Sequence, residues 1–190
     1  MAIVLASQSP RRQELLARIG VEDFKTLSLD IDESYPEGLS PEDTVRYIAK
    51  KKCDAAAALC SPDDLIITAD TMVFLGNDRL GKPRDEEDAL RMLRELAGRG
   101  HTVCTGVSVR RGAQEERFAV STRVFFRPMT DDEIRAYIKT GEPMDKAGAY
   151  GVQSRGALFV ERIDGDFFNV MGLPVEQLGL VLARFGVKLL

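Results

Sequence analysis

The sequence TVCTGVSVR at residues 102–110, together with ERFAVSTRVFF at residues 116–126, decides the fold class of this chain. Both segments are rich in β-branched and aromatic residues, and the turn residue Gly112 lies between them. Two such runs around a glycine turn predict a β-hairpin. A hairpin is antiparallel, so the sheet that contains it is not the purely parallel sheet of a doubly wound fold.

Helical and strand patterns intermix on both sides of this hairpin. The segment at residues 130–139 begins with Thr-Asp-Asp-Glu, the signature of a helix capping box, and Ser9 followed by Pro10 is a good helix start. Further strands are predicted at residues 3–6, 65–75 and 158–163, and further helices at residues 13–19, 42–59, 85–97 and 175–185. We therefore expect an α/β fold with a mixed sheet.

The composition is that of a single soluble domain. The chain has 190 residues, of which 44% are hydrophobic and 29% charged, and its formal net charge is -4. This length suits one core, and the net charge provides no positive field for nucleic acid. No apolar run approaches a membrane span, the N-terminal run is too short for a signal peptide, and the three cysteines lack metal-ligand spacing. We expect a cytoplasmic protein with reduced thiols and no nucleic-acid or membrane partner.

The first chemical feature is the segment SQSPRR at residues 7–12. A helix N-terminus carries a partial positive charge and normally favours acidic residues, yet here Arg11 and Arg12 occupy the first turn. Backbone N–H groups, the hydroxyls of Ser7 and Ser9 and two guanidinium groups would suit a polyphosphate. An exposed basic turn is the alternative from these residues alone. A Walker A motif is excluded because its glycines and its Gly-Lys-Ser/Thr ending are missing.

The second feature is Asp70, in the segment IITADT at residues 66–71. A carboxylate that ends a run of buried apolar residues is costly unless it binds a metal or faces a cleft. At the carboxyl end of a strand it would lie where α/β proteins usually bind ligands. Asp70 is therefore a candidate cation ligand or proton acceptor, and an ordinary strand-ending turn is the alternative.

Two further segments are too rich in glycine and polar residues to belong to a core. Lys82 lies between Gly81 and Pro83, and a glycine-rich loop occupies residues 141–153. Such a loop can bring backbone close to a ligand, and a solvated connector is the alternative. The one histidine, His101, precedes a predicted strand, and we expect it to be structural.

Taken together, these segments resemble the Maf family of nucleotide pyrophosphatases from end to end. The motifs that carry the resemblance are, in order, LASQSPRR (5–12), ADT (69–71), LGKP (80–83), HTVCTGV (101–107), GEP with DKAGAYGVQ (141–153) and NVMGLP (169–174). Each motif alone is weak evidence, but their order and spacing make the set specific.

The resemblance implies a fold like that of inosine triphosphate pyrophosphatases: an elongated mixed sheet with flanking helices and a cleft between two lobes. It also implies hydrolysis of a nucleoside triphosphate to the monophosphate and pyrophosphate, with Mg²⁺ or Mn²⁺ as the cofactor and a homodimer as the working form. By the family pattern Asp70 is the proton acceptor, and Arg12, Thr71 and Gln153 influence the choice of base. Glu33 and Asp70 are the expected metal ligands. The expected substrate-binding residues are Ser7, Ser9, Arg11, Arg12, Lys52, Thr71, Lys82 and Gln153.

Two of these assignments depend on local detail. Lys50, Lys51 and Lys52 are consecutive, so a slip of one residue would change which lysine serves the site. Gln153 resembles the branch of the family that acts on dTTP and UTP, whereas the branch acting on 7-methyl-GTP has an acidic residue there. An amide offers both a donor and an acceptor to the imide edge of uracil or thymine. Ser154 replaces a glycine common at the next position, and we expect it to stiffen the loop.

A protein of another class remains an alternative. A non-catalytic nucleotide-binding regulator of cell division would need the phosphate-binding turn but no carboxylate that activates water. The presence of Asp70, Glu33 and Lys82 together favours an enzyme. A nucleic-acid-binding protein is supported by little more than the pair Arg11 and Arg12.

Overall fold

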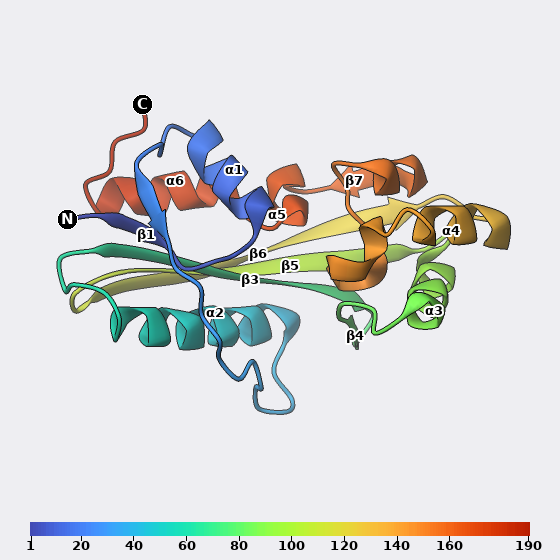
Figure 1. The fold of residues 1–190 in the computed structure, drawn as a ribbon, viewed down its shortest axis with the longest axis horizontal. Helices are drawn as coiled ribbons and strands as arrows, with labels where there is room; N and C mark the ends of the chain where they lie inside the picture. Colours follow the sequence, from blue (N-terminus) through green and yellow to red (C-terminus); the bar gives the residue numbers. More distant parts are fainter. The chain divides into compact units, whose positions relative to one another are not determined.

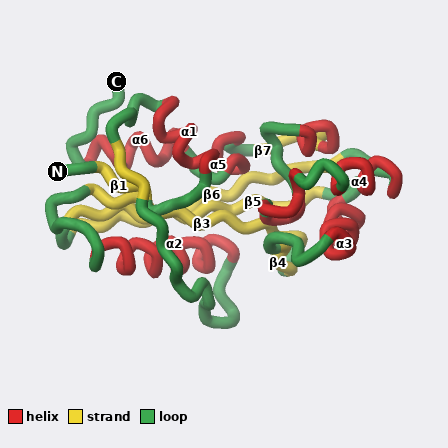
Figure 2. The backbone as a smooth tube through the Cα atoms, viewed as in Figure 1, coloured by secondary structure: helices red, strands yellow, loops and turns green.

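The computed structural model describes residues 1–190, which group into two compact units. Unit 1 comprises Met1–Asp70, Thr105–Val120 and Gly172–Leu190, and unit 2 comprises Thr71–Cys104 and Ser121–Met171. The three long strands β3, β5 and β6, drawn as arrows in Figure 1 and in yellow in Figure 2, carry the chain from one unit into the other.

The strands form a mixed sheet. Their order is β2-β1-β3-β5-β6-β7, and β4 pairs with β3 outside this path. β1 is parallel to β2 and β3, whereas β4 is antiparallel to β3 and β7 is antiparallel to β6. The bounds are β1 Ile3–Leu5, β2 Phe24–Thr26, β3 Leu65–Leu75, β4 Asp78–Leu80, β5 Gly100–Arg111, β6 Gln114–Phe126 and β7 Val160–Asp164. The predicted hairpin is present as β5 and β6, which are neighbours in the sheet.

Three helices cover the strands of unit 1. Figure 1 shows α2 (Pro41–Ala57) on one side of the strands, with α1 (Pro10–Arg18) and α6 (Val175–Arg184) on the other. α1 begins at Pro10, as predicted, and ends in a turn in which Val21 N–H donates to the carbonyl of Leu16 at 3.2 Å. That turn requires a positive φ, which Gly20 supplies at 93°.

α2 packs unusually close to the sheet at Gly106 of β5. A Cβ placed on Gly106 would lie 2.3 Å from the backbone carbonyl carbon of Val45 in α2. Real Cβ atoms do not approach backbone this closely, so only glycine fits at this crossing. This contact fixes α2, and with it the side chains that α2 presents to β3.

Unit 2 contains two helices that pack on each other, followed by short turns. α4 (Asp131–Ile138) begins with the predicted capping box, in which Thr130 and Glu133 cap each other's backbone N–H groups. Arg94 of α3 (Glu86–Leu96) forms an ion pair with Asp131 at the start of α4. The remaining elements are α5 (Phe167–Met171) and three 3-10 turns, η1 (Glu142–Asp145), η2 (Ala147–Ala149) and η3 (Arg155–Phe159).

The predicted long elements are confirmed, with ends that differ by one to three residues in most cases. β2, β4 and α5 were not predicted, because segments of three to five residues are too short to show a periodicity. β1 is as short, but it was predicted from its continuous apolar run. No helix of the chain combines the length and apolar character needed to cross a membrane. The mixed sheet with flanking helices is thus confirmed, while the cleft implied by the resemblance stays a prediction.

Candidate active site

The turn from β1 into α1 is organised by Arg12. Its Nε donates to the carbonyl of Gly172 at 2.8 Å, and its Nη1 donates to the carbonyl of Ala69 at 3.0 Å and to Ser7 Oγ at 3.3 Å. Ser9 is the N-cap residue, as predicted, but its side chain makes no capping hydrogen bond. Instead its N–H donates to Ser7 Oγ at 3.2 Å. The two serines and Arg12 therefore form one connected turn.

Arg12 also experiences the charges around it. Burial lowers the pKa of the Arg12 guanidinium, and the positive charge of Arg11 lowers it further. The negative charges of Asp70 and Glu33 raise it, but the pKa is lowered overall. An arginine remains protonated under such shifts. Arg12 is therefore a fixed cation near two carboxylates, and Arg11 lies half-buried beside it.

The strand predicted at residues 65–75 is confirmed, but Asp70 lies inside it and not, as expected, at its carboxyl end. β3 continues through Asp70 to Leu75, and the aspartate is only 6% exposed. The strand that ends here is β1, whose last residue, Leu5, pairs with Ile67, so Asp70 lies beyond the carboxyl end of β1. β3 runs on because β5 accompanies it in the sheet and β4 pairs with it from Val73. α/β proteins usually bind ligands beyond the carboxyl ends of parallel strands. Here that strand is β1, and Asp70 of the neighbouring β3 lies just beyond its end.

The carboxylate of Asp70 is only half satisfied. Oδ1 accepts a hydrogen bond from Lys52 Nζ at 2.8 Å, whereas Oδ2 is buried without a hydrogen-bond partner. Thr68, two residues earlier in β3, is fully buried, but its hydroxyl donates to the carbonyl of Ala49 at 2.7 Å. A buried oxygen without a partner is costly to keep, which makes Asp70 a candidate for binding a ligand or moving a proton.

The structure distinguishes the three consecutive lysines of α2. Successive helical residues point about 100° apart, so only one of the three can face β3. Lys50 pairs with Asp54 on the helix surface, and Lys51 reaches Asp32. Lys52 contacts both Asp70 at 2.8 Å and Glu33 at 2.9 Å, and its side chain is 15% exposed. Lys52 is therefore the lysine of the site.

Lys51 has a role that sequence reasoning missed. Its Nζ donates to Asp32 Oδ2, to the carbonyl of Ser34 and to Ser34 Oγ, at 3.2, 3.2 and 3.4 Å. Hydrogen bonds from Ser34 and from Lys51 lower the pKa of Asp32 to about 2. Lys51 and Lys52 thus hold three consecutive residues, with Glu33 in the middle. The sequence contains the acidic segment DES at residues 32–34 and a run of lysines at residues 50–52, whose charges are complementary. Nothing in the sequence, however, shows that the two segments lie together.

Glu33 and Asp70 fit a divalent cation that arrives with its own ligands. Asp70 Oδ2 is an unbonded buried oxygen, and the Glu33 side chain is 49% exposed and so can be reached from solvent. The chain contains no cluster of three or more His, Cys, Asp or Glu side chains arranged to hold a metal. Mg²⁺ commonly uses one or two protein carboxylates and completes its shell with substrate phosphates and water. This donor set suits that mode of binding.

The remaining predicted site residues belong to unit 2. Thr71 follows Asp70 in β3 and is half-buried, whereas Lys82 and Gln153 are exposed. The turn of Lys82 and the glycine-rich loop are joined, because Gly148 N–H donates to the carbonyl of Gly81 at 3.1 Å. Unit 1 therefore gathers Ser7, Arg12, Glu33, Lys52 and Asp70 in one place, and unit 2 carries Thr71, Lys82 and Gln153.

Comparison with known proteins gives the family. A sequence model described as Maf-like protein matches residues 2–185. The chain belongs to the Maf-like family. It is 46% identical to the dTTP/UTP pyrophosphatase of Bacillus velezensis, covering 98% of this chain and 97% of that protein. It is 47% identical to the dTTP/UTP pyrophosphatase of Dictyoglomus turgidum, covering 99% and 98%.

A solved structure supports the fold of this Maf-like chain. The HAM1 protein from Coxiella burnetii superposes with a TM-score of 0.57 at 14% identity, covering 97% of this chain and 99% of that one. At this identity the likeness shows the fold alone. The fold class implied by the resemblance is thereby confirmed.

His101 is structural in this Maf-like chain, as expected. His101 is 2% exposed, and its ring contacts Phe126 and Tyr150 edge-on, with centroids 4.9 and 5.4 Å away. Its Nε2 lies 2.8 Å from the Tyr150 hydroxyl, and burial lowers the pKa of His101 to about 4. The imidazole is therefore neutral at physiological pH and supports the start of β5.

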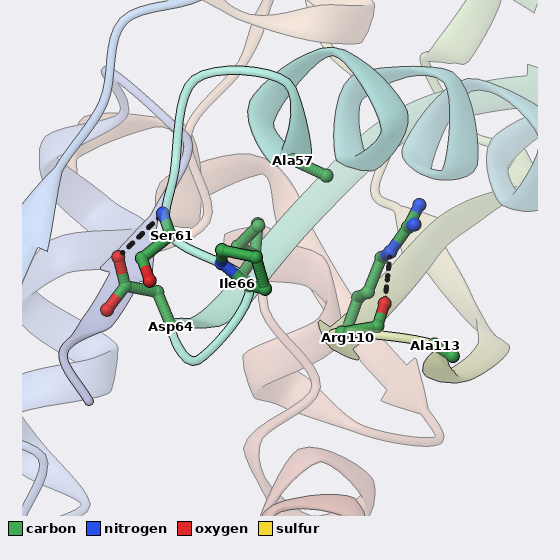
Figure 3. Close-up of a pocket in the computed structure, with 8 residues that line it drawn as sticks. Ala57, Ser61, Asp64, Ile66, Arg110 and Ala113 are labelled. Atoms are coloured by element: carbon green, nitrogen blue, oxygen red, sulfur yellow. Dashed lines mark hydrogen bonds between the residues drawn. The ribbon is translucent and has the colours of Figure 1, made fainter.

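A cavity of about 330 Å³ in unit 1 is separate from these residues (Figure 3). Its polar groups are already engaged: Asp64 accepts from the N–H groups of Ala2 and Ser61, and Arg110 donates to Asp54 and to the carbonyl of Gly112. No predicted site residue lines this cavity. The candidate active site is therefore the cluster around Lys52.

Proposed function

We propose that this Maf-like chain is a nucleoside triphosphate pyrophosphatase that hydrolyses dTTP and UTP to the monophosphate and pyrophosphate. The observation that carries the proposal is the Asp70 carboxylate, which is buried in β3, bonded to Lys52 through one oxygen and unpartnered at the other. Relatives that share 46–47% of their residues with nearly the whole chain are named for this activity.

The unpartnered oxygen gives Asp70 its proposed role. Oδ2 is free to accept a proton from a water molecule, while the bond from Lys52 holds the carboxylate in place. In this scheme Asp70 orients and deprotonates the water that attacks the α phosphorus, and pyrophosphate leaves. Because Asp70 lies in a strand flanked by its neighbours in the sheet, it needs no rearrangement before the reaction.

The cations of unit 1 would stabilise the triphosphate. Arg12 is fixed by three hydrogen bonds, and Lys52 is mostly buried, so neither must be ordered when the substrate binds. One cation about 4 Å from a phosphate oxygen contributes roughly 4 kcal/mol at an effective dielectric constant near 20, which is about a thousandfold in rate if it acts on the transition state. General-base assistance typically adds about 10²–10⁴-fold. By these magnitudes charge stabilisation is the larger effect when two cations act together.

A divalent cation, Mg²⁺ or Mn²⁺, completes the proposal. Glu33 and Asp70 would hold it, and when bound it would neutralise charge on the phosphates. Asp70 would then both accept the proton from water and help to hold the cation. We therefore expect its loss to reduce activity more than the loss of any other residue of the site. We further infer from the family resemblance that the protein works as a homodimer in the cytoplasm.

Base selection is proposed to depend on Gln153 of unit 2. Its amide can donate and accept at once, as the imide edge of uracil or thymine requires. A carboxylate in its place would repel the carbonyl oxygens of these bases. Gln153 is exposed, so a ligand can reach its side chain without a conformational change. Thr71 and Lys82 are the further residues of unit 2 proposed to contact the substrate.

A substrate panel tests this function. Initial rates with dTTP, UTP, CTP, GTP and 7-methyl-GTP would be scored for both monophosphate and pyrophosphate, with Mg²⁺, with Mn²⁺ and with a chelator. We expect pyrophosphate release from dTTP and UTP that stops when the metal is removed. Preference for 7-methyl-GTP would overturn the role of Gln153. Binding of dTTP without any release of pyrophosphate would favour the non-catalytic regulator.

A further inference from the structure

The carboxylate of Glu142 is a centre of hydrogen bonding outside the catalytic cluster. Glu142 Oε1 accepts from the Tyr137 hydroxyl at 2.8 Å, from Ser154 Oγ at 2.6 Å and from the Gly156 N–H at 3.2 Å. Glu142 Oε2 accepts from the Arg155 N–H at 3.2 Å. One side chain at the start of η1 thus holds three consecutive residues that begin immediately after Gln153.

The residues before Gln153 are held by the same network. The Gly151 N–H donates to the Tyr137 hydroxyl at 3.2 Å, and that hydroxyl in turn donates to Glu142. The loop at residues 151–156 is therefore attached on both sides of Gln153, while Gln153 itself is exposed. We call the Glu142 and Tyr137 side chains, with the bonds they make to this loop, the loop clamp.

The ends of the loop approach each other so closely that only glycine fits. A Cβ on Gly156 would lie 2.6 Å from the carbonyl oxygen of Gly151 and 2.9 Å from the Tyr137 hydroxyl. Lys146 holds the backbone of Glu142 itself, because its Nζ donates to the Glu142 carbonyl at 2.7 Å. The loop clamp therefore holds a compact loop whose two ends, Gly151 and Gly156, lie against each other.

The charge state of the clamp is fixed at neutral pH. Burial raises the pKa of Glu142, but hydrogen bonds from Ser154, Tyr137, Gly156 and Arg155 outweigh it and lower the pKa overall. Burial and the bond to Glu142 raise the pKa of the Tyr137 hydroxyl. The glutamate is thus ionised and accepts only, and the tyrosine keeps the proton that it donates. Charge-assisted hydrogen bonds of this kind are stronger than neutral ones.

We propose that Glu142 is a positioning residue for base selection: through the loop clamp it fixes the direction in which Gln153 presents its amide to the pyrimidine. This inference rests on the proposed function, and it names the residue that makes the selectivity of that function possible. A pair of hydrogen bonds to an imide edge is directional, so an amide on a mobile loop must be ordered at each binding event and discriminates less well. Ser154 adds a bond that a glycine at this position could not make.

Substitutions in the clamp give the direct test. We expect Glu142→Ala to raise KM for dTTP and UTP by about tenfold, the effect of roughly one lost net hydrogen bond, while kcat changes by less than about threefold. CTP offers a different pattern of donors and acceptors, so its kcat/KM should change little and the preference for dTTP over CTP should fall. Glu142→Gln keeps one carbonyl oxygen and should give an intermediate result. Ser154→Gly, a change at an exposed position, should reduce the preference in the same direction.

A matched control and a second measurement separate positioning from general damage. Glu161→Gln removes an exposed carboxylate of β7 in the same unit and should leave all kinetic constants unchanged. Hydrogen exchange of the Arg155 and Gly156 amides should accelerate in Glu142→Ala and in Ser154→Gly. Loss of activity in equal proportion for dTTP, UTP and CTP would indicate a structural role only and would overturn the inference.

The outcomes also distinguish this inference from the proposed function. A wild-type protein that releases no pyrophosphate from dTTP or UTP would overturn the function and the inference together. An active wild type whose Glu142→Ala and Ser154→Gly variants keep the same ratio of dTTP to CTP turnover would overturn the inference alone. Unchanged amide exchange at residues 155–156 in those variants would do the same.

Discussion

Lys52 Nζ lies 2.8 Å from Asp70 Oδ1, and the other oxygen of that carboxylate is buried without a hydrogen-bond partner. Lys52 also reaches Glu33 at 2.9 Å, so one ammonium group joins the two carboxylates that are proposed to hold the cation. A cation that binds there adds positive charge beside Lys52, and the negative charge of a polyphosphate would offset the repulsion between them. The site is therefore suited to a metal that arrives bound to its substrate.

The first prediction concerns Asp70. Asp70→Asn keeps the size of the side chain and an acceptor for Lys52, but it removes the charge that accepts a proton and attracts a cation. We expect the variant to remain folded, with pyrophosphate release from dTTP reduced by about a thousandfold or more. Release is measured with a coupled phosphate assay, and folding is monitored by thermal denaturation. A variant with turnover within tenfold of the wild type would remove Asp70 from the mechanism.

The second prediction separates Lys51 from Lys50. Lys51→Ala removes the bonds that hold Asp32 and Ser34, so the segment around Glu33 is less ordered although Lys52 still contacts Glu33, and more of it must be ordered when the cation binds. We expect the Mg²⁺ concentration for half-maximal activity to rise by roughly five- to tenfold, with little change in kcat at saturating Mg²⁺. Lys50→Ala is the matched control, because Lys50 pairs only with an exposed residue of its own helix and such pairs contribute little. Equal responses from the two variants would contradict the prediction.

The third prediction concerns pH and His101. Burial lowers the pKa of His101 from 6.5 to about 4, so between these pH values the unfolded chain binds more protons than the folded chain. The stabilisation from a neutral buried imidazole is therefore fully present above about pH 6.5 and is lost as the pH falls towards 4. Its size is on the order of 3 kcal/mol, from about 1.4 kcal/mol for each pKa unit.

His101→Gln provides the measurement for that prediction. Glutamine does not titrate, and its amide can still bond the Tyr150 hydroxyl. We expect the variant to be less stable than the wild type at pH 7, by urea denaturation, and the difference in free energy of unfolding to shrink as the pH is lowered to 4.5. A difference that stays constant over this range would show that His101 titrates normally in the folded protein.

Long elements with clear boundary signals were predictable from the sequence, and the assembly of the site was less so. The capping box at Thr130 and the apolar run of β3 could be predicted because each is a pattern of residues close together in the sequence. Asp70 was singled out from the sequence, but its placement at a strand end was wrong, because β3 continues to Leu75 with β5 paired beside it. That pairing depends on β5, which lies about 30 residues further along the chain.

The contacts that were missed share one cause. Glu142 bonds residues 12 to 14 positions away, and Lys51 bonds residues 17 and 19 positions away. No periodicity connects residues at such separations, so only the folded chain shows them together. The choice of Lys52 among three lysines required the rotation of α2 relative to β3, which the contact between Val45 and Gly106 determines. Resemblance to a family supplied that choice from the sequence, and the structure explains it.

The last prediction concerns this contact. Gly106→Ala would place a Cβ 2.3 Å from the backbone of Val45, and backbone cannot move aside as the end of a flexible side chain can. We expect α2 to be displaced from β5, with a loss of stability of about 3 kcal/mol or more and a loss of activity because Lys52 moves with the helix. Gly179→Ala is the matched control: it lies inside α6, its Cβ would have no neighbour nearer than 3.8 Å, and alanine should stabilise the helix by about 1 kcal/mol. Both are measured by urea denaturation, and a Gly106→Ala protein as stable as the wild type would show that α2 does not depend on this approach.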